Sequence, residues 1–174
     1  MKIKILLIST LTYCIISSLT ACVGDVHCPA FPEKLKVFYP YEKGDTLKFV
    51  NTANDTLKLI IEELQMTKAY TFPENCDGMC GVNFGFTTGV DEKSLIGISG
   101  SIVTASLKGD YGDGGMIKCS IICEHSATYY ADFTLSMDTI TLTNSYNPGF
   151  VVIKKNVGIE SFYDIENDCT WTKI

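Results

Sequence analysis

Apolar and polar residues alternate with a period of two along most of the chain, as they do in half-buried β-strands. Leu47 and Phe49 share one face of such a segment, and Ile117, Cys119 and Ile121 share one face of another. The alternating segments are residues 45–49, 57–64, 82–87, 102–107, 116–123, 129–136, 139–143, 150–155, 159–165 and 169–174. Turn-forming clusters of Asn, Asp, Gly and Pro separate them. The pattern therefore predicts an all-β domain of about nine to eleven strands in an antiparallel meander.

A meander of this size can bury its apolar faces in two ways, and the sequence leaves both open. It closes as a sandwich of two sheets or as a flattened barrel, and a calycin-like barrel would carry a small apolar ligand in its mouth. Tyr39, Tyr41, Tyr129 and Tyr130 are candidates for a binding surface, although Tyr on strands more often covers the core.

The apolar pattern of residues 57–64 fits both a strand and a helix. Leu57, Leu59 and Ile61 alternate as in a strand, whereas Leu57, Ile60, Ile61 and Leu64 would form one stripe of a helix. Asn54 or Asp55 would cap that helix. We favour a strand, because the turn formers just before Leu57 predict a hairpin.

The N-terminus has the layout of an export signal. Lys2 and Lys4 precede an apolar run, Ile5–Leu19, that is shorter than the roughly 20 residues needed to cross a bilayer. The next residues, LTAC ending at Cys22, resemble the lipobox of bacterial lipoproteins. That resemblance implies that Cys22 becomes the first residue and carries a diacylglycerol and a further acyl chain such as palmitate. An ordinary signal peptide cut after Ala21 is the alternative.

These features divide the chain into three parts. Residues 1–21 are the expected signal peptide, 22–30 a lipidated tether that contains His27, and 31–174 a single domain large enough to bury a core. The expected location is the outer membrane, where the N-terminal lipid anchors the protein on the periplasmic or the cell-surface side. More than one acyl chain would make that anchoring stable.

Both ends of the domain resemble a group of small Bacteroidetes-type lipoproteins of uncharacterised function. The opening matches an FPEKL, PY, GD and DTL pattern, and the ending matches a VVI, Gly, Phe and Trp pattern. The matching positions are Phe31–Leu35, Pro40, Tyr41, Gly44, Asp45, Leu47, Phe49, Asn51, Asp55–Leu57, Val151–Ile153, Gly158, Phe162 and Trp171. The resemblance implies a β-rich lipoprotein and supplies no catalytic residues.

Six cysteines remain after Cys14 leaves with the signal and Cys22 takes the lipid. An even number in an exported protein predicts disulfides, whose connectivity the sequence does not determine. The candidates are Cys28, Cys76, Cys80, Cys119, Cys123 and Cys169. Cys76 and Cys80 lie in the turn-rich stretch 73–81, where we expect a loop. We predict that this pair bonds to Cys119 and Cys123 and that Cys28 bonds to Cys169.

We expect neither a metal nor a catalytic centre. The two Cys-x-x-x-Cys pairs differ from the usual zinc spacing. Asp110 and Asp113, in the acidic turn 108–115, lack the spacing of a calcium loop. His125 follows Cys123 closely, but an oxidised Cys is no nucleophile.

The numbers and types of charged residues limit the classes of partner that we expect. All 14 basic residues are Lys, against 20 acidic residues. Nucleic-acid binding is disfavoured, because it calls for a basic surface and commonly for Arg. Three classes remain: a binding or structural module that contacts protein or glycan, which we favour; a carrier of a small apolar ligand; and an enzyme. No cofactor is expected.

Overall fold

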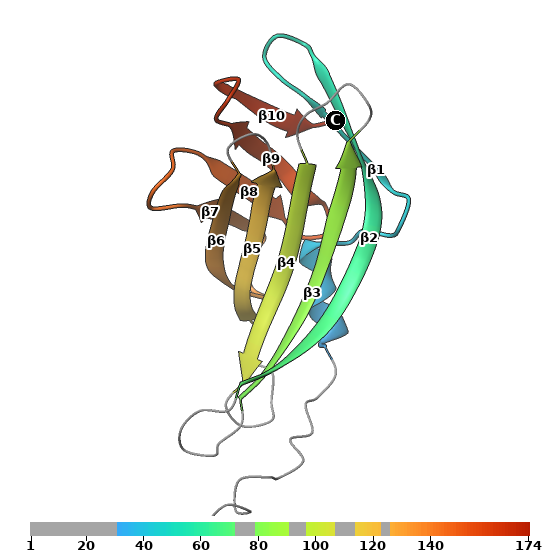
Figure 1. The fold of residues 1–174 in the computed structure, drawn as a ribbon, viewed down its shortest axis with the longest axis vertical. Helices are drawn as coiled ribbons and strands as arrows, with labels where there is room; N and C mark the ends of the chain where they lie inside the picture. The colour runs from blue at the N-terminus through green and yellow to red at the C-terminus, as the bar shows by residue number, and fades with distance from the viewer. Residues whose placement is uncertain (1–30, 72–78, 91–96, 107–113, 123–125) are drawn as a thin grey trace, which may run out of the picture.

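The computed structural model describes residues 31–71, 79–90, 97–106, 114–122 and 126–174. In these residues the chain forms a closed barrel of ten antiparallel strands (Figure 1). The predicted all-β meander is confirmed, and of the two closures that the sequence left open the chain adopts the barrel.

A short 3₁₀-helix precedes the strands. The elements are η1 (Glu33–Phe38), β1 (Thr46–Val50), β2 (Thr56–Thr71), β3 (Met79–Val90), β4 (Gly97–Ser106), β5 (Gly114–Ile122), β6 (Ala127–Thr134), β7 (Thr139–Thr143), β8 (Phe150–Lys154), β9 (Gly158–Asp164) and β10 (Cys169–Lys173). Each strand pairs with its neighbours in sequence, and β1 pairs with β10 to close the ring.

The predicted first hairpin is confirmed. Leu47 pairs with Leu59, and Phe49 pairs with Leu57, so that all four side chains are buried on the inner face. In the turn, the Asn51 side chain accepts hydrogen bonds from the backbone N–H groups of Ala53 and Asp55. The register of β1 on β2 therefore follows from the turn chemistry and the alternation together.

The segment with conflicting signals is a strand, as predicted. A β-bulge interrupts the pairing of β2 with β3 between Ile61 and Glu63. The extra residue changes which side chains face inward, so Leu64 packs against the core although it lies three residues after Ile61. Ile60 is 45% exposed, which the helical stripe would not allow. The bulge thus produced a spacing that imitates a helix.

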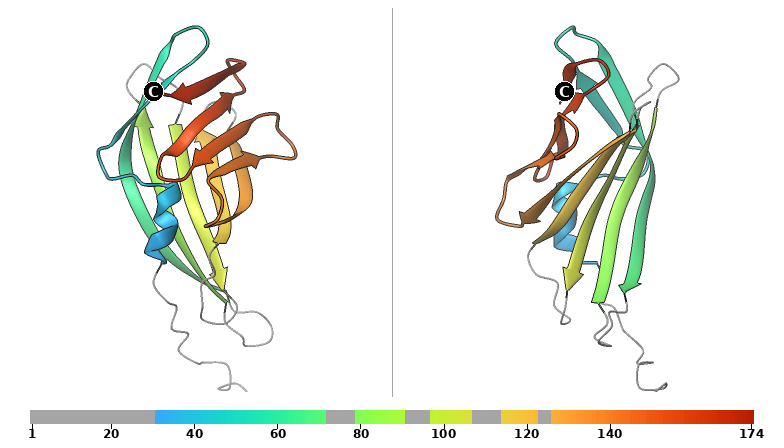
Figure 2. Two further views of the ribbon diagram at one scale, coloured as in Figure 1. Left: turned by 180° about the vertical axis from the view of Figure 1, so that it is seen from behind. Right: turned by 60° about the vertical axis from the view of Figure 1, so that its left-hand side comes forward.

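The barrel is asymmetric, and η1 packs one face against its interior while Glu33 and Lys34 stay exposed. The strands β2–β5 are long, whereas β7, β8 and β10 have five residues each. Figure 2 shows η1 against the inner surface of the long strands, in the half that the short strands do not line. Leu35 and Phe38 of η1 are fully buried. No pattern in the sequence predicts this helix.

Aromatic rings connect η1 and the residues after it to the barrel wall. Phe38 packs edge-on against Phe133 with centroids 5.0 Å apart, and Tyr39 packs edge-on against Phe86 at 4.9 Å. Tyr41 also contacts Phe86, at 5.0 Å. We call residues 31–41 the plug, because five of their side chains are buried in the core that the described part of the wall encloses.

The hairpin of β9 and β10 is held by a buried carboxylate. Asp164 is 1% exposed and accepts hydrogen bonds from the backbone of Glu166 and from the Asn167 amide. It also accepts one from Trp171 Nε1 at 3.3 Å. A buried charge requires such partners, and these fix the path of β10 beside β9.

Two loop predictions need correction. Cys80 lies on β3, where its backbone pairs with Tyr70 and Ser106, and not in a loop. The strand continues through these turn-forming residues because β2 and β4 supply hydrogen-bonding partners on both sides. Gly114 and Gly115 likewise belong to β5 and not to the predicted turn. The rest of that turn lies outside the described residues.

The register also contradicts a bond between Cys80 and Cys119. Cys119 pairs with Gly100, which pairs with Phe86, six residues further along β3 than Cys80. At about 3.3 Å per residue the two Cα atoms are separated by roughly 20 Å, against the roughly 7 Å that a disulfide permits. The loop-to-strand pairing proposed from the sequence is therefore wrong for this pair.

Cys119 and Cys169 both carry free thiols. Cys119 is fully buried, and burial raises the pKa of its thiol to about 12. Cys169 is half-buried, and its pKa is also raised, mainly by burial. Cys28, the partner expected for Cys169, lies outside the described residues, as do Cys76 and Cys123.

Alkylation of the unreduced protein with iodoacetamide at mildly alkaline pH, followed by peptide mapping, will report each thiol separately. We expect Cys169 to be labelled in the folded protein. Cys119 should be labelled only after unfolding, since the reactive thiolate is suppressed in the core. If either residue needs a reductant before it reacts, that residue is oxidised and the free thiol assignment fails.

Candidate functional site

The interior around the plug is a packed aromatic cluster. The Tyr39 hydroxyl donates a hydrogen bond to the Lys118 carbonyl at 3.0 Å, and the Tyr39 and Tyr41 rings stack at 6.2 Å. Burial raises the pKa of both tyrosines well above the usual value. Tyr39 and Cys119 are 0% exposed. Tyr39 and Cys119 are therefore neutral and closed to solvent.

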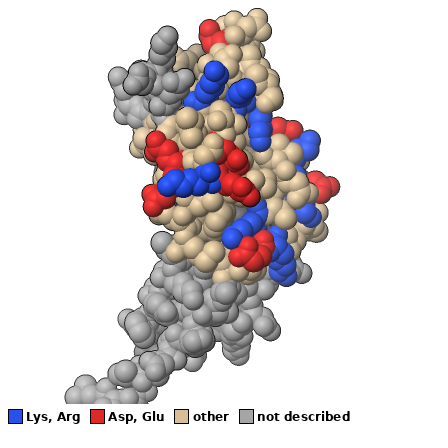
Figure 3. All heavy atoms as spheres, turned by 90° about the vertical axis from the view of Figure 1, so that its right-hand side faces the viewer, with Lys and Arg blue, Asp and Glu red and all other residues tan. Residues whose placement is uncertain are grey.

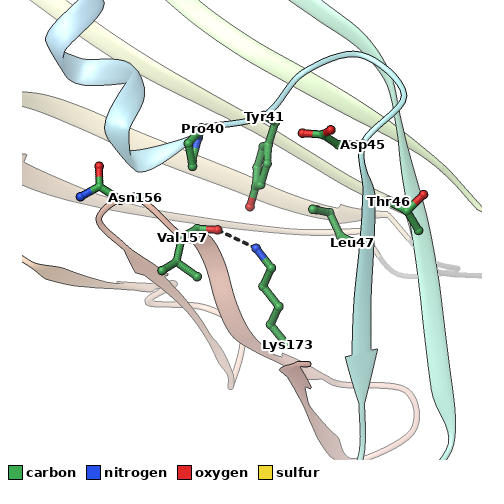
Figure 4. A pocket seen from close by; sticks show the side chains of 8 residues that line it. All are labelled: Pro40, Tyr41, Asp45, Thr46, Leu47, Asn156, Val157 and Lys173. Carbon is green, nitrogen blue, oxygen red and sulfur yellow. Dashed lines mark hydrogen bonds between the residues drawn. The ribbon is translucent and has the colours of Figure 1, made fainter.

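A polar cleft lies beside the plug at the rim of the barrel. It has a volume of about 380 Å³, within the range of about 300–1,000 Å³ that is typical of ligand sites. The strands β1 and β9 begin at this rim, and β8 and β10 end there. Figure 4 shows the lining residues, which are Pro40, Tyr41, Asp45, Thr46, Leu47, Asn156, Val157 and Lys173.

The register of β1 on β10 leaves room for this cleft. Pairing is confined to Phe49 with Lys173 and Val50 with Thr172. The start of β1, with Thr46 and Leu47, therefore extends past the end of the ladder. Tyr41 crosses this uncovered side and forms the floor of the cleft (Figure 4).

Tyr41 is the most constrained group in the cleft. Its hydroxyl oxygen accepts a hydrogen bond from the Ile159 backbone N–H at 2.6 Å, and the residue is 7% exposed. The hydroxyl proton itself has no acceptor within the described part of the chain. A buried donor without an acceptor costs about 1–3 kcal/mol. This orphaned donor points to an oxygen acceptor that enters the cleft.

Lys173 supplies a second donor. Its Nζ donates to the Val157 carbonyl at 2.7 Å and lies 5.7 Å from the centroid of the Tyr41 ring. Partial burial lowers the pKa of Lys173, while the nearby Asp45 carboxylate opposes that shift. An ammonium group has three N–H donors, so one bond to a carbonyl leaves two for a ligand.

Asp45 provides an acceptor at the mouth of the cleft. Its Oδ2 accepts a hydrogen bond from the Glu42 backbone N–H at 2.8 Å, which closes a tight turn before β1. The Asp45 backbone carbonyl accepts from Ile61 N, which fixes the turn to β2. The side chain is exposed and lies toward Tyr41 in Figure 4.

Charges elsewhere do not gather into one large patch on the face that Figure 3 presents. Lys and acidic side chains are interspersed there. An exposed pair of Lys154 with Glu160, 3.2 Å apart, is typical of such a solvated surface.

The structure separates the residues that the sequence singled out. Tyr39 and Tyr129 belong to the core, Tyr130 is 47% exposed, and Tyr41 alone of the four lines the cleft. Asp45 and Lys173 were not predicted as site residues, since no spacing in the sequence connects them. The candidates Cys22, His27, Cys28, Cys76, Asp110, Asp113, Cys123 and His125 lie outside the described residues.

The described residues contain no group of three His, Cys, Asp or Glu side chains that could hold a metal ion. Within the same residues, no helix has the length and apolar character needed to cross a membrane.

The fold and the cleft define the chain as a plugged, ten-stranded antiparallel β-barrel. Comparisons with family models, with curated proteins and with solved structures found no match.

Gly158 tests how tightly the Tyr41 hydroxyl is held. A Cβ at Gly158 would overlap the Tyr41 hydroxyl and ring, whereas one at Gly44 would meet nothing within 4 Å. Both glycines have positive φ, +81° and +94°, so Ala imposes similar backbone strain at each. We expect Gly158→Ala to lower the free energy of unfolding by about 1–3 kcal/mol more than Gly44→Ala, because overpacking adds to the strain. Urea unfolding will measure the difference, and equal losses would contradict the close Tyr41 contact.

Proposed function

We propose that the protein is an exported, lipid-anchored binding module that recognises a protein or glycan partner at its surface. The β-barrel is the rigid body that displays the recognition surface. The lipid on Cys22 holds it at the outer membrane, and residues 22–30 link the lipid to the plug. This proposal assigns it no catalytic role and no cofactor.

The burial of the plug in the described part of the barrel interior is the observation that carries this proposal. Phe31, Leu35, Phe38 and Tyr39 are at most 3% exposed, and they occupy the space where a calycin-like carrier would hold its ligand. A ligand that replaced them would have to displace a covalently attached aromatic cluster from well-packed contacts. Recognition at the rim or on the outer wall requires no such rearrangement.

The interior can be probed with small apolar molecules. We expect the wild-type protein to bind neither benzene nor the larger fluorophore N-phenyl-1-naphthylamine. Phe38→Ala should bind benzene, because an emptied aromatic site in a core leaves a dry apolar cavity. This variant should also lose about 3–5 kcal/mol of stability. Ligand-observed NMR will detect benzene, and fluorescence will detect the naphthylamine.

Tyr146→Ala is the matched control, since the Tyr146 ring is 91% exposed and its removal creates no cavity. Stoichiometric uptake of either molecule by the wild-type protein would reject surface recognition in favour of the carrier.

The anchor has a separate test. Cys22→Ala removes the sulfur that would carry the diacylglycerol, so the protein should move from the membrane fraction to the soluble fraction. Cys28→Ala, six residues further along the tether, should leave the fractionation unchanged. Membrane association of Cys22→Ala equal to that of the wild type would exclude lipid anchoring at this residue.

A further inference from the structure

The chemistry of the cleft specifies what kind of group it accepts. Two donors lie at its floor: the Tyr41 hydroxyl proton, which has no acceptor among the described residues, and the two remaining N–H groups of Lys173. Tyr41 is 7% exposed, so its hydroxyl is nearly withdrawn from bulk water. A ligand that pairs with both donors must therefore carry oxygen acceptors at two neighbouring positions.

On the opposite side of the cleft, the Asp45 carboxylate can accept hydrogen bonds from donors on a ligand. Asp45 uses Oδ2 for the Glu42 N–H, and a carboxylate can accept further hydrogen bonds on its remaining lone pairs. Its side chain lies across the cleft from Lys173 in Figure 4. A fitting group thus presents acceptors to Tyr41 and Lys173 and donors to Asp45.

The remaining lining residues are of both kinds: Thr46 and Asn156 are polar, whereas Pro40, Leu47 and Val157 are apolar. The apolar residues and the Tyr41 ring provide carbon surface beside the polar groups. Such surfaces pack against C–H groups. The fitting group consequently combines an aliphatic frame with several polar oxygens.

Other ligand classes match this arrangement less well. An anion such as phosphate would meet one ammonium and the repulsion of Asp45, in a chain whose basic residues are all Lys. A metal ion would find a single carboxylate opposed by Lys173. A wholly apolar ligand would leave both floor donors unpaired.

We propose that this cleft binds one or two rings of a neutral, hydroxyl-rich saccharide. Each hydroxyl can donate and accept, so one ring can satisfy Tyr41, Lys173 and Asp45 together while its C–H faces contact Pro40 and Val157. This inference rests on the proposed surface-recognition function and names glycan as the partner.

Saturation-transfer NMR on the full chain in detergent provides the test. The panel contains maltose, cellobiose and N,N′-diacetylchitobiose as neutral saccharides, with glucuronate, inorganic phosphate and alanine as charged or zwitterionic competitors. We expect at least one neutral disaccharide to bind more tightly than all three competitors. Tyr41→Phe, Lys173→Met and Asp45→Asn should each weaken that binding about tenfold, the effect of one lost hydrogen bond.

Lys48→Met is the matched control, because Lys48 is an exposed lysine on β1 that does not line the cleft. It should leave the affinity unchanged. Asp45→Asn keeps an oxygen for the Glu42 N–H, so it should still fold and report on binding even where Tyr41→Phe is unstable.

Three outcomes would overturn the inference: no binding of any saccharide in the panel, tighter binding of phosphate, glucuronate or alanine, or saccharide binding that all three cleft variants leave intact. These results differ from failure of surface recognition itself, which would appear as uptake of apolar molecules into the wild-type barrel.

Discussion

A ten-stranded barrel encloses more space than its own inward side chains can fill. Interior width grows with strand number, and about eight strands already give the largest barrel that wall side chains alone can pack. This chain solves the problem with the plug, residues 31–41, which enters before the first strand. Without it, Phe86, Phe133 and their neighbours would face either water or a void. The closed ten-stranded wall therefore depends on the plug to cover its inward side chains.

Apolar burial alone would not hold the plug in one position. Its five buried side chains, from Phe31 to Tyr41, are worth about 1.5–3 kcal/mol each. Fixing the backbone of residues 31–41 costs about 1–2 kcal/mol per residue in conformational entropy. The total cost is therefore similar in size to the gain from burial. Directional bonds must then select the observed arrangement. Three hydrogen bonds do so. Asn156 N donates to the Val37 carbonyl, the Tyr39 hydroxyl donates to the Lys118 carbonyl, and Ile159 N donates to the Tyr41 hydroxyl.

The sequence predicted the parts of the fold that depend on local pattern. Alternation located the strands, and the Asn51 turn established the first hairpin. It did not predict η1, because Leu35 and Phe38 lie on one side of a single short turn, which leaves no repeat to recognise. It misplaced Cys80, because a Gly-rich stretch resembles a loop until neighbouring strands pair with it on both sides. The sequence also could not predict that Cys119 is a free thiol, because this depends on the distances between cysteines on different strands.

The candidate site was less predictable than the fold, and the reason lies in ring closure. Asp45 precedes the first strand and Lys173 ends the last one, so only the pairing of β1 with β10 brings them to one cleft. Tyr41 joins them because Gly158, at φ +81°, lets the β8–β9 turn come close enough for Ile159 N to reach the hydroxyl. A residue with a side chain at position 158 would displace Tyr41 from the floor. The same contact that fixes the plug thus uses the acceptor side of the Tyr41 hydroxyl and leaves its proton for whatever enters the cleft.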